Sequence, residues 1–594
     1  MRNRDPIPPL APAARRLDAA IAGALGLALS LLFWLGRSRS FGAGDSAQHV
    51  LCAVLWGIPH PPGYPLQTAL GWLWSRPWSD RGAAVNGLSG LLHAAAAATL
   101  FFLLRRGGCR RPAALAAAGF MALSPLFWYY SLIAEVRALN DLLALAAAFF
   151  ALEWSRNGRG RSLYYFAAAF GLGLSHHPTY PLLIPAFAVW LSARRASPRQ
   201  AARAALIALA ALAAPYALLR LRLAWSAPAY NLFDTADWRG LLALFLRTNL
   251  GGPLRMAAGG AARGREVFDP LALREQLSNL AASVWEHVGP AALGLAAAGA
   301  ASLWRRDRRG LLGWLLWFAA AALVPVVLAS RQMAGHDPDY VRAAVTRFYL
   351  LPMIALFVLS GYGAELLASR ARPAFAWALA AAAFVLPLAL RPLGLSRANP
   401  QLDAARALVR DSRPGDLVVL DSDDAIFAAL DLELVRGETG GRIFLTPAAF
   451  SLPSYIRFLS RRHPELRVPP PGPAGLTTDW AAWMRLNPDR AVLFEPALLD
   501  VALSRYPRSA AQGALIRVST AAARSDPAAD ARRFLEAPET AELTRWNVRP
   551  WTQEIYLLKT RRRMAEWLAS RLDPKRDEAL LRAYAGLLAA LGPP

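Results

Sequence analysis

A carboxylate and an imidazole, two groups that can move protons, lie in one segment rich in proline and glycine. Asp45 comes first, and His60 follows within the run 59–65, where most residues are proline or glycine. This composition excludes a continuous helix and restricts the backbone, so the segment can hold Asp45 and His60 in fixed positions. We expect Asp45 to act as a base. The structural alternative is that Asp45 caps a helix beginning near Ser46, and the two roles are compatible.

Two further segments place ionisable residues beside long apolar runs. Glu135 and Arg137 lie between two such runs, and His176 and His177 end another. Ionisable side chains at the edge of a membrane are costly and are candidate functional residues. The alternative for the first segment is a local ion pair between Glu135 and Arg137. The histidines could bind a metal, a phosphate or a carboxylate. A shared metal is least favoured, because adjacent helical residues point about 100° apart.

Long apolar helices must position these residues. The chain has 594 residues, of which 55% are hydrophobic, and its first two thirds repeat apolar runs near the roughly 20 residues that cross a bilayer. We interpret the first run as a retained helix rather than a signal peptide, because no clear cleavage site follows it. The sequence predicts about eleven transmembrane helices: 19–35, 83–104, 112–132, 139–154, 163–177, 178–192, 204–219, 288–304, 311–328, 348–367 and 375–390.

The net charge of +25 comes almost entirely from arginine. In a soluble chain this charge would suggest nucleic acid, but short arginine-rich loops are typical of the cytoplasmic side of a membrane protein. With the N-terminus inside, every loop predicted to be cytoplasmic is basic, and Asp45, Glu135 and His176 all face outward. We therefore expect a multi-pass protein of the cell inner membrane with no nucleic-acid partner. The basic loops are 105–111, 156–161, 194–195, 305–309 and 370–372.

A later outward segment, residues 331–349, carries arginines where arginine is rare. One explanation is that a residue such as Arg347 binds an anionic head group. A solvated loop is an equally good explanation.

The composition changes near Asn399, and no apolar run of spanning length follows it. We predict a transmembrane domain over 1–395 and an extracytoplasmic soluble α/β domain over 396–594, with strands at 417–420, 442–445 and 491–494. Three carboxylates follow the first of these strands. They could bind a cation or an acceptor, but a solvated turn is the favoured interpretation. They are Asp421, Asp423 and Asp424.

Several of these segments resemble the motifs of a large family of bacterial membrane proteins, formerly a domain of unknown function, that is related to the vertebrate transmembrane protein O-mannosyltransferase. The first motif is 45–48 with 60–65, the second is 134–140, and the third is 171–177. Residues 347–352 and 417–424 agree with the family more loosely. The chain departs from the family at Gln48, where glutamate is usual, and at Arg137, where tyrosine is usual.

The resemblance implies a GT-C type glycosyltransferase fold and a polyprenyl-phosphate sugar as donor. It implies that Asp45 is the catalytic base, and we add Glu135 as a second catalytic candidate. Gln48 weakens the case for a two-carboxylate or metal site, so we predict no resident metal or cofactor, although a divalent cation is compatible with such chemistry. The predicted substrate-binding residues are Gln48, His60, Tyr64, Arg137, Asn140, His176, His177 and Arg347.

The predicted function is transfer of a sugar, with mannose as one candidate, to an extracytoplasmic protein or glycan. A transporter or flippase of a lipid-linked precursor is the main alternative. It would require ionisable residues at mid-bilayer and an inverted repeat, whereas the polar residues here gather at one surface. A non-catalytic scaffold is a third possibility and would tolerate loss of Asp45 and Glu135.

Overall fold

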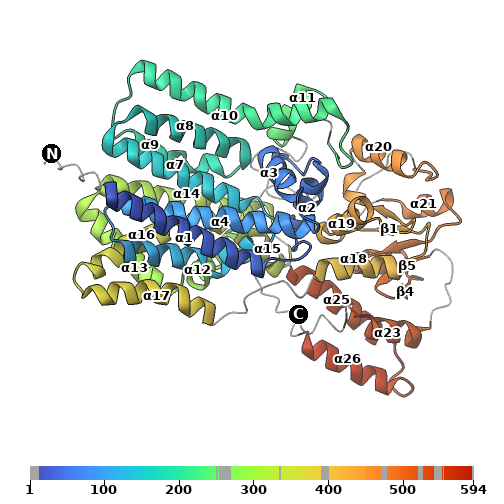
Figure 1. Ribbon diagram of the computed structural model, residues 1–594. Coiled ribbons are helices and arrows are strands. Elements are labelled where there is room, and N and C mark those ends of the chain that lie inside the picture. Colours follow the sequence, from blue (N-terminus) through green and yellow to red (C-terminus); the bar gives the residue numbers. More distant parts are fainter. Residues whose placement is uncertain are drawn as a thin grey trace.

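The computed structural model shows a long bundle of helices joined at one end to a smaller region that contains a β-sheet (Figure 1). The predicted domain boundary at residue 395 and Leu390, the end of the last predicted span, lie outside the described residues. The described residues are 12–233, 235–248, 252, 269–333, 336–389, 400–450, 452–469, 478–519, 526–538, 540, 552 and 554–591.

The helical bundle is built from long helices and a few short ones. The longer helices are α1 (Pro12–Gly36), α4 (Arg81–Arg106), α7 (Arg137–Asn157), α8 (Gly160–His176), α10 (Pro198–Trp225), α12 (Pro270–Val288), α13 (Pro290–Arg306), α14 (Arg308–Gln332), α16 (Leu350–Ala368) and α17 (Pro373–Ala389). The shorter helices are α2 (Ser46–Leu55), α3 (Pro65–Ser75), α5 (Arg111–Ala122), α6 (Pro125–Leu132), η1 (Tyr180–Leu183), α9 (Ile184–Leu191), α11 (Trp238–Phe245), α15 (Pro338–Thr346) and η3 (Arg347–Tyr349).

In the described residues, every predicted apolar run is mainly helical, formed by one helix or by two consecutive ones, and the chain is a multi-pass membrane protein. Within the described residues, six helical segments are long and apolar enough to cross a membrane, or seven if the bent pair α5 and α6 is one span. The predicted count of eleven is therefore not confirmed. The predicted span 112–132 is in fact two helices bent by 63°, because Ser124 and Pro125 start a new helix. Helices α8, α13 and α17 have 17 residues each.

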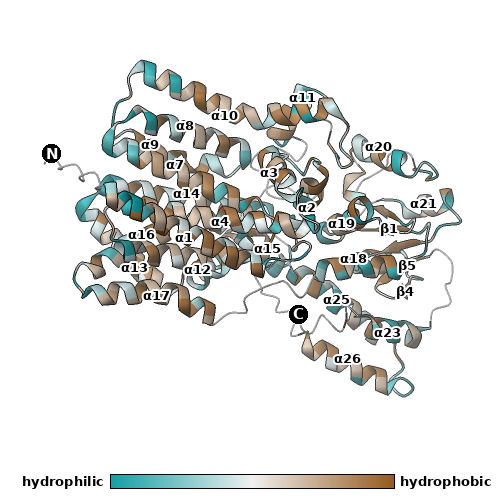
Figure 2. Cartoon of the chain, in the orientation of Figure 1, coloured by the Kyte–Doolittle hydropathy of each residue, from teal (hydrophilic) through white to brown (hydrophobic). Residues whose placement is uncertain are grey.

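The basic loops gather at one end of the bundle. Asp18 of α1 bonds Arg105 and Arg111, Glu365 of α16 bonds Arg110, and the side chain of Arg194 donates to backbone carbonyls at the end of α7. Hydrophilic residues concentrate at this end, and hydrophobic residues cover the helices between the two ends (Figure 2). The C-terminal region packs against the opposite end (Figure 1).

The C-terminal region contains a five-stranded sheet with strand order β2-β1-β3-β5-β4. Strand β1 (Leu417–Val419) is parallel to β2 (Ile443–Leu445) and β3 (Val492–Phe494), as the predicted strands suggest. The strands β4 (Ala510–Gln512) and β5 (Leu515–Val518) add an antiparallel edge that the sequence analysis missed. The helical elements are α18 (Pro400–Arg410), α19 (Asp423–Asp431), η4 (Leu432–Arg436), η5 (Pro447–Ala449), α20 (Pro453–Arg462), α21 (Trp480–Leu486), η7 (Pro496–Leu498), α22 (Leu499–Arg505), α23 (Pro527–Glu536), α25 (Glu554–Ala569) and α26 (Glu578–Ala590).

One hydrophobic cluster joins the sheet to the end of the bundle. Leu51 of α2 and Tyr230 after α10 belong to the same buried cluster as Val418 and Phe427. Burial of apolar side chains is the main force that holds packed elements together, at roughly 25 cal/mol for each Å² removed from water. The short helix α2 is therefore held between the membrane helices and the C-terminal region.

Candidate functional site

An arginine shared by two carboxylates forms the centre of the site. Nη1 of Arg347 donates to Oδ2 of Asp45 over 2.6 Å and to Oε1 of Glu135 over 3.2 Å. The side chains of Asp45 and Arg347 are 18% and 15% exposed, and that of Glu135 is 3% exposed. The structure thus brings together three predicted site residues from three distant segments, and it keeps Asp45 within reach of solvent.

Asp45 precedes α2, which begins at Ser46 as predicted. Its carboxylate makes no capping hydrogen bond to the helix, so the proposed capping role is wrong. The ion pair with Arg347 takes up one carboxylate oxygen instead. Asp45 is therefore held for an interaction outside its own helix.

Glu135 and Arg137 do not form the local ion pair that was the structural alternative for their segment. Glu135 accepts from the backbone N–H of Val136 and from Arg347. The guanidinium of Arg137 lies over the ring of Phe348, with 4.2 Å from its carbon to the ring centroid. Arg137 is 5% exposed, and within the described residues it has no hydrogen bond, its Nε being buried without a partner. A buried cation in this condition can bind an anion.

Gln48 connects two parts of the site. Its Nε2 donates to the hydroxyl of Tyr230 over 2.9 Å, and its Oε1 lies 2.5 Å from Nδ1 of His60. The other ring nitrogen of His60 lies 3.3 Å from the hydroxyl of Tyr64. Because an amide can both donate and accept, Gln48 orients the imidazole, which a glutamate could also do but with an added charge.

The turn between α2 and α3 fixes His60 and Tyr64, as the run of prolines and glycine predicts. Gly63 has a φ of 87° and Tyr64 a φ of 40°, so both adopt the left-handed conformation that glycine tolerates and tyrosine rarely does. A Cβ at Gly63 would also meet Leu244 at 2.6 Å. The strained backbone at Tyr64 is typical of a functional site.

Both predicted histidines line the same region but make separate contacts. His176 bonds the carbonyl of Val136 through Nε2 over 2.8 Å, and its buried Nδ1 has no partner among the described residues. His177 bonds Thr179 and stacks on Tyr64 at 6.1 Å between ring centroids. Asn140 is 1% exposed and its Oδ1 has no partner among the described residues. The two histidines thus place separate hydrogen-bonding groups around Tyr64.

The C-terminal region completes the site with two carboxylates. Oδ1 of Asp424 accepts from the backbone N–H of Gly44 over 2.5 Å. Asp423 lies close enough to Asp45 and Arg347 to feel both charges. The favoured prediction of a solvated turn at 421–424 is therefore wrong for Asp424, because the turn packs against the segment that carries Asp45.

Charge and burial shift the pKa values of Asp45 and Asp423 in opposite directions. Burial alone would raise the pKa of Asp45, but Arg347, with smaller effects of His60 and His49, holds that pKa below its usual range. Asp423 keeps part of its surface in solvent, yet desolvation and the charge of Asp45 raise its pKa to about 7. Burial lowers the pKa of His60 to about 4. At neutral pH, Asp45 is ionised and His60 is neutral.

Three site residues were missed by the sequence analysis. His49 lies one turn after Asp45 on α2, with its ring 5.8 Å from that of His60 and its Nε2 unpartnered among the described residues; the spacing of four residues from Asp45 could have identified it. Tyr230 holds Gln48. Arg247 affects the pKa of His60 and Tyr64. Tyr230 and Arg247 lie in a long connection that offered no motif.

The arrangement combines three kinds of group. A carboxylate can act as a base, side-chain hydrogen-bond donors can hold a ligand, and arginines can bind an anion. In the described residues, no group of three or more histidine, cysteine or acidic side chains has the geometry to hold a metal ion. The chemistry that these residues themselves can perform is proton abstraction by a carboxylate next to a stabilised phosphate.

Comparison with known proteins shows which proteins the part of the chain that carries this site is similar to. Residues 45–200 match the family model described as "Protein O-mannosyl-transferase TMEM260 N-terminal domain". The chain is 27% identical to Protein O-mannosyl-transferase TMEM260 of Mus musculus over 429 residues, which cover 68% of this chain and 59% of the relative. It is 25% identical to the Dictyostelium discoideum protein of that name over 184 residues, which cover 28% of this chain and 22% of the relative.

The chain thus spans about three fifths of the mouse protein and about one fifth of the Dictyostelium protein. Among solved structures, the crystal structure of ArnT from Cupriavidus metallidurans in the apo state aligns with 85% of this chain and 98% of its own, at 12% identity and a TM-score of 0.40. The matched region 45–200 contains Asp45, Gln48, His60, Tyr64, Glu135, Arg137, Asn140, His176 and His177. This chain is therefore related, through the part that carries most of its candidate site, to the protein O-mannosyl-transferase TMEM260 family.

Proposed function

We propose that the chain is a membrane glycosyltransferase of GT-C type that transfers a sugar from a polyprenyl-phosphate donor to a hydroxyl of a protein or glycan outside the cytoplasm. The observation that carries this proposal is the arrangement of Asp45 and Glu135 around Arg347, beside the buried and unbonded Arg137. This site lies where the apolar helices meet the C-terminal region. A lipid-linked donor could enter there from the bilayer, and mannose is the sugar that the relatives' name suggests.

The proposed reaction is a displacement at the anomeric carbon. The acceptor oxygen forms a bond to that carbon as the bond from carbon to the phosphate oxygen breaks. Asp45 takes the proton of the acceptor hydroxyl, and polyprenyl phosphate leaves with the bonding electrons. Arg347, Arg137 and Arg247 are the cations that could meet the charge of the leaving phosphate.

The ion pair between Asp45 and Arg347 suggests how the base becomes active. Arg347 keeps the pKa of Asp45 low, so Asp45 is ionised but a weak base in the free protein. A donor phosphate that takes over part of the hydrogen bonding of Arg347 would raise the pKa of Asp45 towards a useful value. Donor binding would thereby prepare the base for the acceptor.

Substitution of Asp45 by asparagine tests the proposal. Asn keeps the size of the side chain but cannot accept the proton, so we expect transfer from a polyprenyl-phosphate sugar to fall by about 10²–10⁴-fold. The assay uses the full chain in membranes or nanodiscs and follows the labelled sugar into the acceptor. Full activity of Asp45→Asn would disprove the role of Asp45.

Transport of a lipid-linked precursor is the second candidate function. Sugar transfer to an acceptor would then be absent, and movement of the labelled lipid between leaflets would depend on the chain. The described structure favours the transferase, because the site lies against the C-terminal region: Asp424 accepts from Gly44, and Asp423 lies near Asp45 and Arg347.

A further inference from the structure

The C-terminal region holds the segment that leads into Asp45. Oδ1 of Asp424, at the start of α19, accepts from the backbone N–H of Gly44 over 2.5 Å. The guanidinium of Arg436, at the end of η4, donates to the hydroxyl of Ser40 over 2.9 Å, and Ser40 is buried. Both contacts therefore end on the short connection between α1 and α2, directly before Asp45.

A second helix of the same region holds the segment that leads into Arg347. Nζ of Lys559, in α25, lies 2.9 Å from Oδ2 of Asp337 and 2.7 Å from Oδ2 of Asp339. Asp337 is the N-cap of α15, and Asp339 lies in its first turn. Helix α15 continues without a break into η3, which starts at Arg347. Lys559 thus fixes the beginning of a short rigid helix that ends at the arginine of the site.

Two further contacts fix α25 against the helical bundle. The ring of Tyr556 lies 5.7 Å from that of Tyr340, in α15, between ring centroids. The carboxylate of Glu554 accepts from the hydroxyl of Tyr129, in α6, over 2.7 Å, and Tyr129 is buried. One partly exposed ion pair stabilises little by itself, but three contacts from one helix to α15 and α6 together restrict where that helix can lie.

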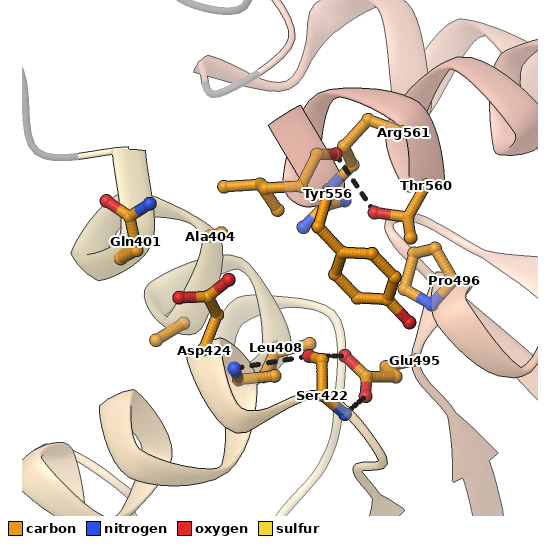
Figure 3. Close-up of a pocket in the computed structure, with 13 residues that line it drawn as sticks. Gln401, Ala404, Leu408, Ser422, Asp424, Glu495, Pro496, Tyr556, Thr560 and Arg561 are labelled. Atoms are coloured by element: carbon orange, nitrogen blue, oxygen red, sulfur yellow. Dashed lines mark hydrogen bonds between the residues drawn. The ribbon is translucent and has the colours of Figure 1, made fainter. Parts of the chain in front are cut away.

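The two holding helices, α19 and α25, lie on either side of one small pocket. Figure 3 shows Tyr556 of α25 and Asp424 of α19 on opposite sides of it. The cavity volume is about 30 Å³, which leaves room for only one or two water molecules. Closely packed interiors have low compressibility and transmit a displacement. The contacts therefore form a closed ring that runs from the Asp45 segment through α19, α25 and α15 to Arg347, and back across the 2.6 Å ion pair.

We propose that the C-terminal region is a clamp that sets the contact between Asp45 and Arg347, with Lys559 and Arg436 as its positioning residues. This inference rests on the proposed function, in which that ion pair controls the base, and it gives the C-terminal region a role in the reaction. The clamp holds each partner of the ion pair through the neighbouring chain. Both side chains of the pair remain available to the substrates.

Charge reversal at Lys559 tests the clamp in the full chain in nanodiscs. Lys559→Glu sets a like charge against Asp337 and Asp339, which should displace α15 and with it Arg347. Burial would raise the pKa of Asp45 and Arg347 holds it down, so displacement of Arg347 lets that pKa rise. We expect the acidic limb of the pH profile of kcat to move up by about one pH unit, and kcat for sugar transfer to fall about tenfold.

Two variants serve as rescue and as matched control. Lys559→Glu combined with Asp339→Lys restores opposite charges, so kcat and the acidic limb should return most of the way. Arg563→Glu reverses a charge on the same helix, but Arg563 bonds Asp500 within the C-terminal region, so both readouts should stay as in the natural chain. Equal effects of Lys559→Glu and Arg563→Glu would overturn the proposal, as would no effect of either.

Ser40→Ala tests the other side of the clamp without a change of charge. It removes the hydroxyl that Arg436 holds, so the acidic limb should move in the same direction by a smaller amount. If thermal unfolding shows that Lys559→Glu does not fold, this variant decides, and an unmoved limb contradicts the clamp. Asp45→Asn separates the two proposals, because its full activity contradicts the proposed function, whereas natural kinetics of the clamp variants contradict the clamp alone.

Discussion

The two ends of the helical bundle contain opposite versions of the same ion-pair cluster. At the arginine-rich end, one carboxylate, Asp18, lies between Arg105 and Arg111. At the other end, one arginine, Arg347, lies between Asp45 and Glu135. The first cluster ties α1 to the end of α4 and the start of α5, and its two cations are partly exposed. The second cluster has an excess of negative charge, and the nearby cations Arg137 and Arg247 form no ion pair with any described residue.

This difference indicates that the Asp18 cluster is a structural anchor and that the Arg347 cluster is a ligand-binding site. At Asp18 both carboxylate oxygens are bonded to arginine, so nothing remains for a ligand. At Arg347 the Nε is buried without a partner, and the same holds for Nε of Arg137 and Arg247 among the described residues. Incomplete hydrogen bonding of this kind is costly in a folded protein and is retained where a ligand completes it.

The largest effect on stability is expected from removal of the central cation. Arg347→Met leaves Asp45 and Glu135 as two close carboxylates without their cation, which we expect to destabilise the fold by about 3–5 kcal/mol. Thermal unfolding of the purified chain measures this loss. The triple variant with Asp45→Asn and Glu135→Gln should recover most of it, and no recovery would show that Arg347 acts through other contacts.

Loss of Arg137 should weaken binding of the lipid donor rather than destabilise the fold. Arg137→Met removes a charged donor, worth about 1.5–3 kcal/mol to a bound phosphate, so we expect KM for the lipid donor to rise about ten- to a hundredfold. The unfolding temperature should change little, because Arg137 makes no hydrogen bond with the part of the chain that the structure describes, its Nε being buried without a partner there. Lower stability with unchanged KM would assign Arg137 to packing against Phe348 instead.

A pH-dependent loss of stability is expected from the C-terminal region. Burial raises the pKa of Glu495 to about 7, while an unfolded glutamate titrates near about 4. A carboxyl with a raised folded pKa contributes stability that is full below about pH 4 and is lost as the pH rises through about 7. The protection of amides around β1 and β3, taken relative to their intrinsic exchange rate at each pH, should therefore fall between about pH 5 and 8, and Glu495→Gln should flatten this change.

The smallest effect is expected at the arginine-rich end. Asp18→Asn keeps a hydrogen-bond acceptor between Arg105 and Arg111, so we expect a loss of about 1 kcal/mol in stability and no change in transfer. Sugar transfer and thermal unfolding measured on the same preparation check both parts. A strong loss of transfer would contradict the division of the two clusters into anchor and site.

The sequence alone predicted the structural features that depend on local residue patterns. The prolines around His60 predicted the break between α2 and α3, and short continuous apolar runs predicted β1, β2 and β3. The segments carrying Asp45, Glu135 and Arg347 do meet in the structure, but their role as site residues stays a prediction. The short strands β4 and β5, of three and four residues, are too brief to be recognised by their pattern.

The pairing within the site could not be predicted, because it depends on tertiary packing. Asp45 and Arg347 are separated by 302 residues, and Gly44 and Asp424 by 380. A helix-capping carboxylate and a solvated acidic turn were reasonable local interpretations of Asp45 and Asp424. Each was wrong for the same reason, namely that a partner from a remote segment took the place of the local one.

The hydrogen bond from Gly44 to Asp424 limits which substitutions the protein can accept during evolution. The donor is a main-chain N–H, which every residue except proline possesses, and only the acceptor depends on a side chain. Gly44 itself has a φ of 66°, a conformation that penalises most replacements. Divergence of the C-terminal region is therefore expected to be constrained at Asp424 by this hydrogen bond, in addition to the packing that constrains the buried residues of α19 such as Phe427.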